Sequence, residues 1–421
     1  MNILLWHPTY VLGGGYLLLV QLLEALGRHP GVTTITAAIH KDYRQWITSD
    51  QFPAKVKQIL VESGTPIESV LGNQDVVYMV WPHGVSIPRI STPTVCVYQD
   101  TILLDAYGAH STDTFLKTME QAVKETVSKY SKVIVTSNYT KQRFLEIVGA
   151  GGMNKVAVLP HIATDPNLKV LPFSGREENV ASGRVSVAAR RSGSGYLIYP
   201  ANVSEHKNHL ALMIAMSKRQ RKDTSLVLCG YGTDSIGKAG VTPNPYLNRL
   251  NKTIMERGLQ SGSDYQALGY VEDTKADELM DGALGLIMPT RAEGMGLPIH
   301  EAIERGLPII ASDLPVLREH FADRSDAILW VDPESPLEIA QAWDYLCDHH
   351  EDMRHMASKS RGCGVTWADV ADKTFRILEE EVRRTPRTLH VPGIGMVGRM
   401  PRRRWLKKVE KSIKRLWRRA G

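Results

Sequence analysis

The feature that most constrains the fold is a repeated alternation of short apolar runs with stretches of helical periodicity. Met1 to Trp6 has the pattern of a buried strand, a glycine turn follows it, and Tyr16 to Leu26 has the apolar spacing of a helix. A second helical stretch runs from Thr112 to Tyr130. Strands that alternate with helices predict a parallel, doubly wound sheet. The other strand-like runs in this half are Val76 to Val80, Thr94 to Tyr98 and Lys132 to Thr136.

A second unit of the same kind begins near residue 196. The stretch from about Ser174 to Gly195 is rich in Ser, Gly, Arg and Glu and has little periodicity, so we place the domain boundary near it. Two Rossmann-like α/β domains fit easily into 421 residues. The strand-like runs of the second half are Tyr196 to Tyr199, Ser225 to Cys229, Leu284 to Met288 and Pro308 to Ala311.

The predicted organisation has five parts. Residues 1–170 form the first Rossmann-like domain, residues 171–195 form a linker or insertion, and residues 196–366 form the second Rossmann-like domain. Residues 367–385 have the spacing of one more amphipathic helix. Residues 386–421 comprise a Gly/Pro-rich linker and a basic tail.

The net charge of +6 hides an uneven distribution. Arg399 to Gly421 carries eleven Lys or Arg and one Glu, or +10, so the remaining residues sum to 40 − 44, or −4. A mildly acidic body with a separate basic tail argues against a protein built wholly around nucleic acid. The 43% hydrophobic and 23% charged content is typical of a globular chain rather than a disordered one.

Cysteine usage and the N-terminal stretch favour a cytoplasmic location. The cysteines lie far apart, with no CxxC pair and no zinc-ligand spacing, which fits a reducing compartment. The stretch from Met1 to Gly15 lacks the basic region and long apolar run of a signal peptide, and no run of 18 apolar residues occurs. We therefore expect no membrane span and no metal site. The cysteines are Cys96, Cys229, Cys347 and Cys363.

The most informative segment is Thr290-Arg-Ala-Glu293-Gly-Met-Gly-Leu-Pro-Ile-His-Glu301-Ala, which follows an apolar strand and opens a helix. Its glycines allow a ligand to approach the backbone closely, and a helix N-terminus favours an anionic group. Glu293 and Glu301 bracket this loop with two carboxylates eight residues apart.

This segment resembles the Glu-x7-Glu motif of glycosyltransferase family 4, whose members have the GT-B fold of two facing Rossmann-like domains. The resemblance implies that Glu293 and the loop after it contact the donor sugar and phosphate. It also implies that Glu301 accepts hydrogen bonds from the ribose hydroxyls. The loop residues predicted to bind the donor are Gly294, Met295, Gly296 and Leu297.

A second match follows the first strand of the second domain, in Asn202-Val-Ser-Glu-His206-Lys207-Asn208-His209. The resemblance implies that Lys207 holds the donor pyrophosphate. Asn202, also a candidate donor-binding residue, stands where commoner members carry Arg. The His-Lys-Asn-His version is similar to mannosyltransferase-like members, so GDP-mannose is the preferred donor and UDP-sugars come next.

Shorter matches keep the family's order. Gly230 ends a strand near the expected nucleotide cleft, and Tyr270-Val271 resembles the segment whose backbone contacts the nucleobase. Gly13-Gly14-Gly15 resembles the N-terminal glycine loop that faces the donor phosphate, which makes Gly14 and Gly15 donor-binding candidates. No third glycine follows at the spacing of an NAD fingerprint, which counts against a dehydrogenase.

Gln99-Asp100 follows a strand, where many relatives carry His-Asp. Asp100 is the candidate acceptor-side carboxylate and joins Glu293 and Lys207 as a predicted catalytic residue. Two histidines are further candidates for the cleft lining: His83 and His110. Two segments resemble first-domain landmarks of the family without an assigned chemistry: Ser137-Asn138-Tyr139-Thr140 and Leu159-Pro160-His161.

The resemblance covers roughly residues 1–380, apart from the Ser/Gly/Arg stretch. It implies a retaining transfer of a hexose from a nucleotide sugar to a glycan or lipid-linked glycan. The donor binds the second domain, the acceptor binds mainly the first, and the final helix crosses back to the first domain. A metal or other cofactor is not required, and the absence of Asp-x-Asp agrees. Two alternatives stay open: a sugar-nucleotide epimerase or hydrolase, and a non-catalytic nucleotide-sugar-binding scaffold.

The basic tail has the pattern of an amphipathic helix over residues 402–419. Its apolar side chains fall within an arc of about 120° and cations fill the rest, which is typical of a helix in an anionic membrane interface. Such docking favours a lipid-linked acceptor and a peripheral position on the inner face of the membrane. The alternatives are packing on protein and, third, nucleic-acid binding, for which no stacking platform is present. The apolar side chains are Trp405, Leu406, Val409, Ile413, Leu416 and Trp417.

Overall fold

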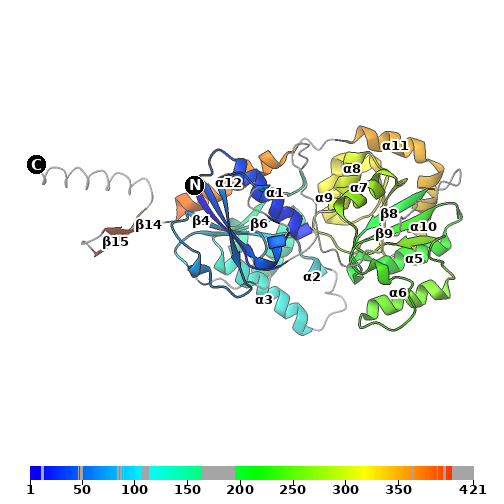
Figure 1. The fold of residues 1–421 in the computed structure, drawn as a ribbon, viewed down its shortest axis with the longest axis horizontal. Helices are drawn as coiled ribbons and strands as arrows, with labels where there is room; N and C mark the ends of the chain where they lie inside the picture. Colours follow the sequence, from blue (N-terminus) through cyan, green and yellow to red (C-terminus); the bar gives the residue numbers. More distant parts are fainter. Residues whose placement is uncertain are drawn as a thin grey trace, which may run out of the picture.

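A computed structural model of the protein describes residues 1–10, 14–45, 47, 51–82, 85, 88, 90–105, 113–163, 195–361, 365–385, 387–391 and 395–400. Two α/β domains lie side by side, with the first on the left and the second on the right of Figure 1. Each domain is built around a parallel sheet, which confirms the predicted doubly wound architecture.

The first domain has a seven-stranded sheet in the order β3-β2-β1-β4-β5-β6-β7. Its helices are α1 (Gly14–Arg28), α2 (Ile102–Asp105), α3 (Asp113–Lys129) and α4 (Asn138–Val148). Its strands are β1 (Asn2–His7), β2 (Thr34–His40), β3 (Val56–Val61), β4 (Val76–Met79), β5 (Thr94–Tyr98), β6 (Lys132–Val135) and β7 (Val156–Val158).

The central strands of this sheet are apolar throughout because both faces are covered. In β1, Ile3 and Leu5 pack into one buried cluster, whereas Leu4 and Trp6 pack into another. Successive side chains of a strand point to opposite faces, so a strand with helices on both sides needs apolar residues at every position.

The second domain has a six-stranded sheet in the order β10-β9-β8-β11-β12-β13. One large buried cluster joins its strands to the surrounding helices. The helices are α5 (His209–Lys218), α6 (Pro245–Glu256), α7 (Asp273–Asp281), α8 (Leu297–Arg305), α9 (Pro315–Phe321), α10 (Pro336–Asp348) and α11 (His350–Lys359). The strands are β8 (Tyr196–Pro200), β9 (Ser225–Cys229), β10 (Tyr265–Ala267), β11 (Gly285–Met288), β12 (Ile309–Ser312) and β13 (Ile328–Val331).

Helix α12 (Trp367–Arg384) follows the second domain but packs on the first (Figure 1). Thr366 caps the helix reciprocally with Asp369. The apolar face of α12 joins the same buried cluster as α1 and β4, so the first domain contains segments from both sides of the second. The cluster residues of this face are Trp367, Val370, Ala371, Leu378 and Val382.

The segment predicted as a Gly/Pro-rich linker contains an antiparallel strand pair instead, β14 (Arg387–Val391) with β15 (Gly395–Met400). Composition misled here, because its Gly and Pro residues were interpreted as a continuous linker although strand-compatible residues lie between them. The tail helix predicted over 402–419 lies outside the described residues, as does most of the 171–195 segment. In the part of the chain that is described, every helix is too short or too polar to cross a bilayer.

Candidate functional site

The strand order of each sheet reverses at one point. In the first domain this switch point lies between β1 and β4, and in the second it lies between β8 and β11. Loops that leave parallel strands at such a switch point diverge and form a crevice, where α/β proteins commonly bind ligands. Lys207 follows β8 and Glu293 follows β11. The two strongest sequence motifs therefore flank the switch point of the second sheet.

Backbone and amide hydrogen bonds join these two loops. A short turn, Glu205–Lys207, ends at Asn208, whose φ of 57° is left-handed and suits Asn better than most residues. The buried Asn208 amide nitrogen donates to the carbonyl oxygens of Pro289 at 2.9 Å and Pro333 at 2.8 Å. The Arg291 amide donates to the carbonyl oxygen of His206 at 2.7 Å. These bonds fix where the Lys207 side chain begins relative to the loop after β11.

Lys207 and Glu293 form an ion pair, in which Nζ donates to Oε1. Their side chains are only 17% and 9% exposed, so solvent screens the pair weakly. The other carboxylate oxygen of Glu293 lies 3.3 Å from the Gly294 amide. Separating the two side chains would leave each charge poorly solvated. The site therefore holds a cation and a carboxylate next to each other.

Asp100 approaches this pair from the first domain, directly after β5. Its Oδ1 accepts a hydrogen bond of 3.0 Å from the Ile102 amide. A Cβ added to Gly294 would lie 2.8 Å from the Cβ of Asp100, so the two domains touch here and only glycine fits. Burial, and to a smaller extent the Glu293 carboxylate, raise the pKa of Asp100, whereas the Ile102 amide and Lys207 lower it; the resulting pKa is about 6. The three predicted catalytic residues therefore come together.

His320, which the sequence did not single out, contacts the same loop from α9. Its Nε2 lies 3.3 Å from the Gly294 carbonyl oxygen. Burial lowers the pKa of His320, so the ring is neutral near pH 7. Because a carbonyl oxygen only accepts, the contact selects the tautomer with the proton on Nε2.

Glu301 lies one turn into α8, beyond the glycines of the loop. Burial is the largest cause that raises its pKa, Arg305 lowers the pKa, and Asp277 and Asp273 raise it; the resulting pKa is about 7. Glu301 also raises the pKa of the Cys229 thiol, which places the carboxylate near the end of β9. Glu301 therefore lies near the end of β9, and its pKa is close to neutral pH.

Gly230 allows the loops after β8 and β9 to meet. Its φ is +133°, and an added Cβ would lie 2.6 Å from the carbonyl carbon of Ala201 and 2.8 Å from the Asn202 nitrogen. Its amide donates to the Gly269 carbonyl oxygen at 2.7 Å. Gly230 thus ends its strand as predicted, its close backbone approach is made to the protein's own chain, and Asn202 beside it is exposed.

Two tyrosines stack on the exposed side of these loops. The rings of Tyr231 and Tyr270 lie 4.9 Å apart at an interplanar angle of 29°, with the residues 47% and 38% exposed. Sequence reasoning named Tyr270 for its backbone and missed Tyr231, although an aromatic between two glycines after a strand is the signal that marks it. Val271, the next predicted residue, packs against the core of the second domain.

Some of the other predicted residues lie in the described part of the chain, and some lie outside it. Gly14 and Gly15 open α1, at the carboxyl edge of the first sheet. Met295 is buried and Leu297 begins α8 after Gly296, whose φ is +73°. Gly13, His83 and His110 lie outside the described residues. In the described ranges, no cluster of three or more His, Cys, Asp or Glu side chains is arranged to hold a metal ion.

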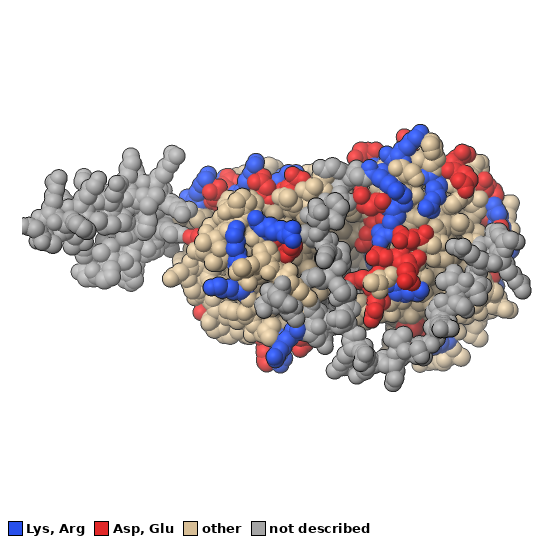
Figure 2. Space-filling model, turned by 45° about the horizontal axis from the view of Figure 1, so that its top comes forward, with Lys and Arg blue, Asp and Glu red and all other residues tan. Residues whose placement is uncertain are grey.

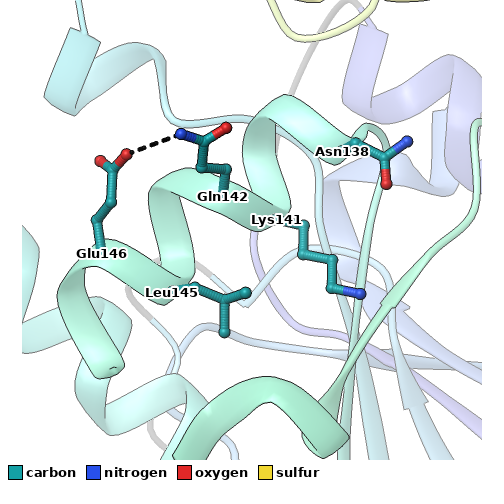
Figure 3. Close-up of a pocket in the computed structure, with 5 residues that line it drawn as sticks. All are labelled: Asn138, Lys141, Gln142, Leu145 and Glu146. Atoms are coloured by element: carbon teal, nitrogen blue, oxygen red, sulfur yellow. Dashed lines mark hydrogen bonds between the residues drawn. The ribbon is translucent and has the colours of Figure 1, made fainter. Parts of the chain in front are cut away.

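A surface hollow lies apart from this site, along one side of α4 (Figure 3). It contains none of the predicted site residues. Its lining side chains are Asn138, Lys141, Gln142, Leu145 and Glu146.

Charged side chains of both signs lie next to one another over the second domain (Figure 2). Arg305 of α8 pairs with Asp277 and Asp281 of α7, and Arg221 pairs with Asp223 and Asp348. These basic side chains pair with acidic neighbours of the same domain, as Lys207 does with Glu293, and they lie outside the crevice loops.

Comparisons with known proteins match this chain to glycosyltransferases. The family model of glycosyl transferases group 1 matches residues 186–362, the domain that holds Lys207, Glu293 and Glu301. The serotype-specific mannosyltransferase WbdA of Escherichia coli is 26% identical over 217 residues, covering 50% of this chain and 24% of WbdA. The O-antigen chain mannosyltransferase B of Escherichia coli is 22% identical over 240 residues, covering 56% of this chain and 57% of that protein. The chain thus spans about a quarter of the length of WbdA.

Solved structures match nearly the whole fold. HepE from Anabaena, solved in complex with UDP and glucose, has a TM-score of 0.65 at 15% identity and covers 90% of this chain and 100% of HepE. The fold is GT-B. WaaG, a glycosyltransferase involved in lipopolysaccharide biosynthesis, has a TM-score of 0.61 at 14% identity and covers 90% of this chain and 99% of WaaG. The family match and the mannosyltransferase relatives support a glycosyltransferase on this GT-B scaffold.

Proposed function

We propose that the chain is a retaining glycosyltransferase of the family 4 type, which transfers a hexose from a nucleotide sugar to a glycan or lipid-linked glycan. The observation that carries this proposal is the meeting of Asp100 from the first domain with the Lys207–Glu293 pair of the second. A donor-side cation and an acceptor-side carboxylate thereby face one crevice between two domains.

Lys207 is suited to the departing diphosphate. When the bond between the anomeric carbon and the phosphate oxygen breaks, its electrons remain on the diphosphate, and a fixed cation stabilises that charge. Two unit charges about 4 Å apart gain about 4 kcal/mol at an effective dielectric of 20. The N-terminus of α8, which begins directly after the 293–296 loop, favours an anion at the same place.

Asp100 is suited to the acceptor. Its pKa is raised to about 6, so it is mostly a carboxylate at pH 7. Because this pKa lies near the working pH, the carboxylate can accept a proton from an acceptor hydroxyl. We assign Glu293 to the donor sugar and Glu301 to the ribose hydroxyls, with the Tyr231–Tyr270 side of the crevice nearest the nucleobase.

The preferred donor in this proposal is GDP-mannose, because both curated relatives described above are mannosyltransferases. UDP-sugars are the second candidate, because HepE was solved with UDP. The proposed reaction needs no metal or other cofactor. The basic tail, residues 402–419, is proposed to dock the enzyme on an anionic membrane at the cytoplasmic side, where a lipid-linked acceptor is available.

Thermal shift with nucleotides tests the donor site, because a ligand that binds the native state stabilises it by mass action. We expect GDP-mannose and GDP to raise the melting temperature, and Lys207→Met to weaken that response. Lys222→Met is the matched control, since Lys222 is exposed and precedes β9, whereas the crevice loops follow the strands. A response to NAD alone, or equal responses of Lys207→Met and wild type, would contradict the donor assignment.

Turnover distinguishes the three activities. A transferase consumes GDP-mannose with a panel of glycan and lipid-linked acceptors and gives a product whose anomeric configuration, measured by NMR, is that of the donor. Conversion of the donor without an acceptor indicates the epimerase or hydrolase, and binding without any conversion indicates the scaffold. Transfer that persists in EDTA supports the metal-independent reaction, whereas a loss reversed by Mg²⁺ or Mn²⁺ contradicts it.

A further inference from the structure

The segment Ser137-Asn138-Tyr139-Thr140, for which the sequence predicts no chemistry, begins helix α4 at the carboxyl edge of the first sheet. Ser137 caps the helix, because its Oγ accepts a hydrogen bond of 3.0 Å from the Thr140 amide. This cap leaves the amides of Asn138 and Tyr139 without an intrahelical acceptor, as the first amides of any helix are.

Glu319 of the second domain supplies the missing acceptor. Its Oε1 accepts from the Asn138 amide at 2.6 Å and from the Asn138 side-chain nitrogen at 2.9 Å. Its Oε2 accepts from the Tyr139 amide at 2.9 Å. A carboxylate at a helix N-terminus gains from both the charged hydrogen bonds and the helix dipole. Because 181 residues separate Glu319 from Asn138, this contact joins the two domains.

Tyr139 strengthens the contact. Its ring packs against the buried cluster of the second domain, although its backbone belongs to α4 of the first. Helices α4 and α9 also contact each other directly. The domains therefore meet here through charge, hydrogen bonds and apolar packing together.

The same short helix, α9, supports the loop that carries Glu293. His320, next to Glu319, contacts the Gly294 carbonyl oxygen at 3.3 Å. An added Cβ on Gly296 would lie 2.7 Å from Leu317 and 3.2 Å from Phe321, so α9 packs directly under the 293–296 loop. One face of α9 thus touches the first domain, and another touches the loop.

We propose that Glu319 is a positioning residue, which fixes the second domain against α4 and, through α9, holds the 293–296 loop at Asp100. It touches neither donor nor acceptor in this role. The expected effect on turnover rests on the proposed function, whereas the contact and its effect on the loop do not. Loss of Glu319 is therefore expected to lower kcat and to leave nucleotide affinity nearly unchanged, because Lys207 and Glu301 remain within the second domain.

Hydrogen exchange of the full chain, measured by mass spectrometry, tests the contact without requiring activity. The variants are Glu319→Ala and the milder Glu319→Gln, which keeps the shape and one acceptor oxygen. Glu146→Gln is the matched control, since Glu146 lies at the other end of α4 (Figure 3). It pairs with Arg143 of the same helix. GDP affinity and GDP-mannose turnover are measured on the same samples.

We expect Glu319→Ala to speed exchange at Asn138 and Tyr139 by about tenfold or more, since bonds to a charged acceptor are lost. We also expect Glu319→Ala to speed exchange at residues 294–296 and to lower kcat, while GDP affinity stays within about twofold. Glu319→Gln should give exchange rates and a kcat between those of wild type and Glu319→Ala. Unchanged exchange at Asn138 and Tyr139, or a rise there that leaves the 294–296 loop unaltered, would overturn the proposal. A wild-type chain without turnover would refute the proposed function alone, because the exchange comparison still decides the role of Glu319.

Discussion

Replacing Gly294 by alanine tests whether the contact between the two domains sets the reaction geometry. The new Cβ would lie 2.8 Å from the Cβ of Asp100, 3.3 Å from its Oδ2 and 3.4 Å from the Gln99 carbonyl oxygen. Carbon atoms in contact prefer a separation of about 3.5–4.0 Å. Because the nearest atom is a Cβ tied to the backbone, Asp100 and the loop must separate by about 1 Å.

A displacement of about 1 Å at reacting groups costs on the order of 100-fold in rate. The backbone amide of residue 294 is retained, and Lys207 and Glu301 are untouched, so we expect GDP affinity to stay within about twofold. Overpacking costs about 1–3 kcal/mol, and the crevice can relieve part of it by opening, so the variant should remain folded.

The assay is steady-state turnover of GDP-mannose with separate kcat and KM, together with a thermal melt of each variant. Gly151→Ala is the matched control, since a Cβ there meets no atom within 4 Å and its φ is outside the left-handed region. A Gly294→Ala protein that is folded and turns over at the wild-type rate would refute the assignment of Asp100 to the reacting centre.

The remaining predictions concern Glu301, Gly230 and the basic tail. The pKa of the Glu301 carboxyl is raised from 4.5 to about 7. Its contribution to the stability of the fold is therefore complete below pH 4.5 and is lost as pH rises through 7. We expect Glu301→Gln to melt at a higher temperature than wild type at pH 8. As the Glu301 carboxyl loses its proton, the GDP affinity of wild type, measured by calorimetry, should rise from pH 6 to pH 8. The affinity of Glu301→Gln should not rise. Gly230→Ala should lower the denaturant-derived stability by about 1–3 kcal/mol more than Gly240→Ala, which is left-handed but unobstructed. Truncation after Pro401 should abolish sedimentation with anionic liposomes and spare GDP binding; liposome binding that survives removes the membrane role.

The sequence was informative where burial or backbone geometry leaves few choices. β1 was predicted because a strand covered on both faces is apolar at every position. The edge strand β3 was not predicted, because it alternates buried and exposed residues irregularly and carries Lys57 and Gln58. β7 and β10 have three residues each, too few to give a periodic signal.

The site was predictable motif by motif but not as an assembly. The glycine loops marked the segments around Lys207 and Glu293, yet the ion pair between them spans 86 residues, and no local pattern encodes it. Glu319 was missed for the same reason, since its partners are backbone amides of another domain, which every residue type except proline supplies. The raised pKa of Asp100 likewise depends on burial between domains.

The return of α12 to the first domain has a consequence for how the chain folds during synthesis. Domains usually fold in the order in which they are made. Here the apolar surface of α1 and β4 stays uncovered until Trp367 to Arg384 has been made. The Phe375 ring of this helix fills the space beside Gly31. The second domain has its whole sheet translated before that helix exists, so the first domain is completed last and stays exposed to chaperones and proteases longest.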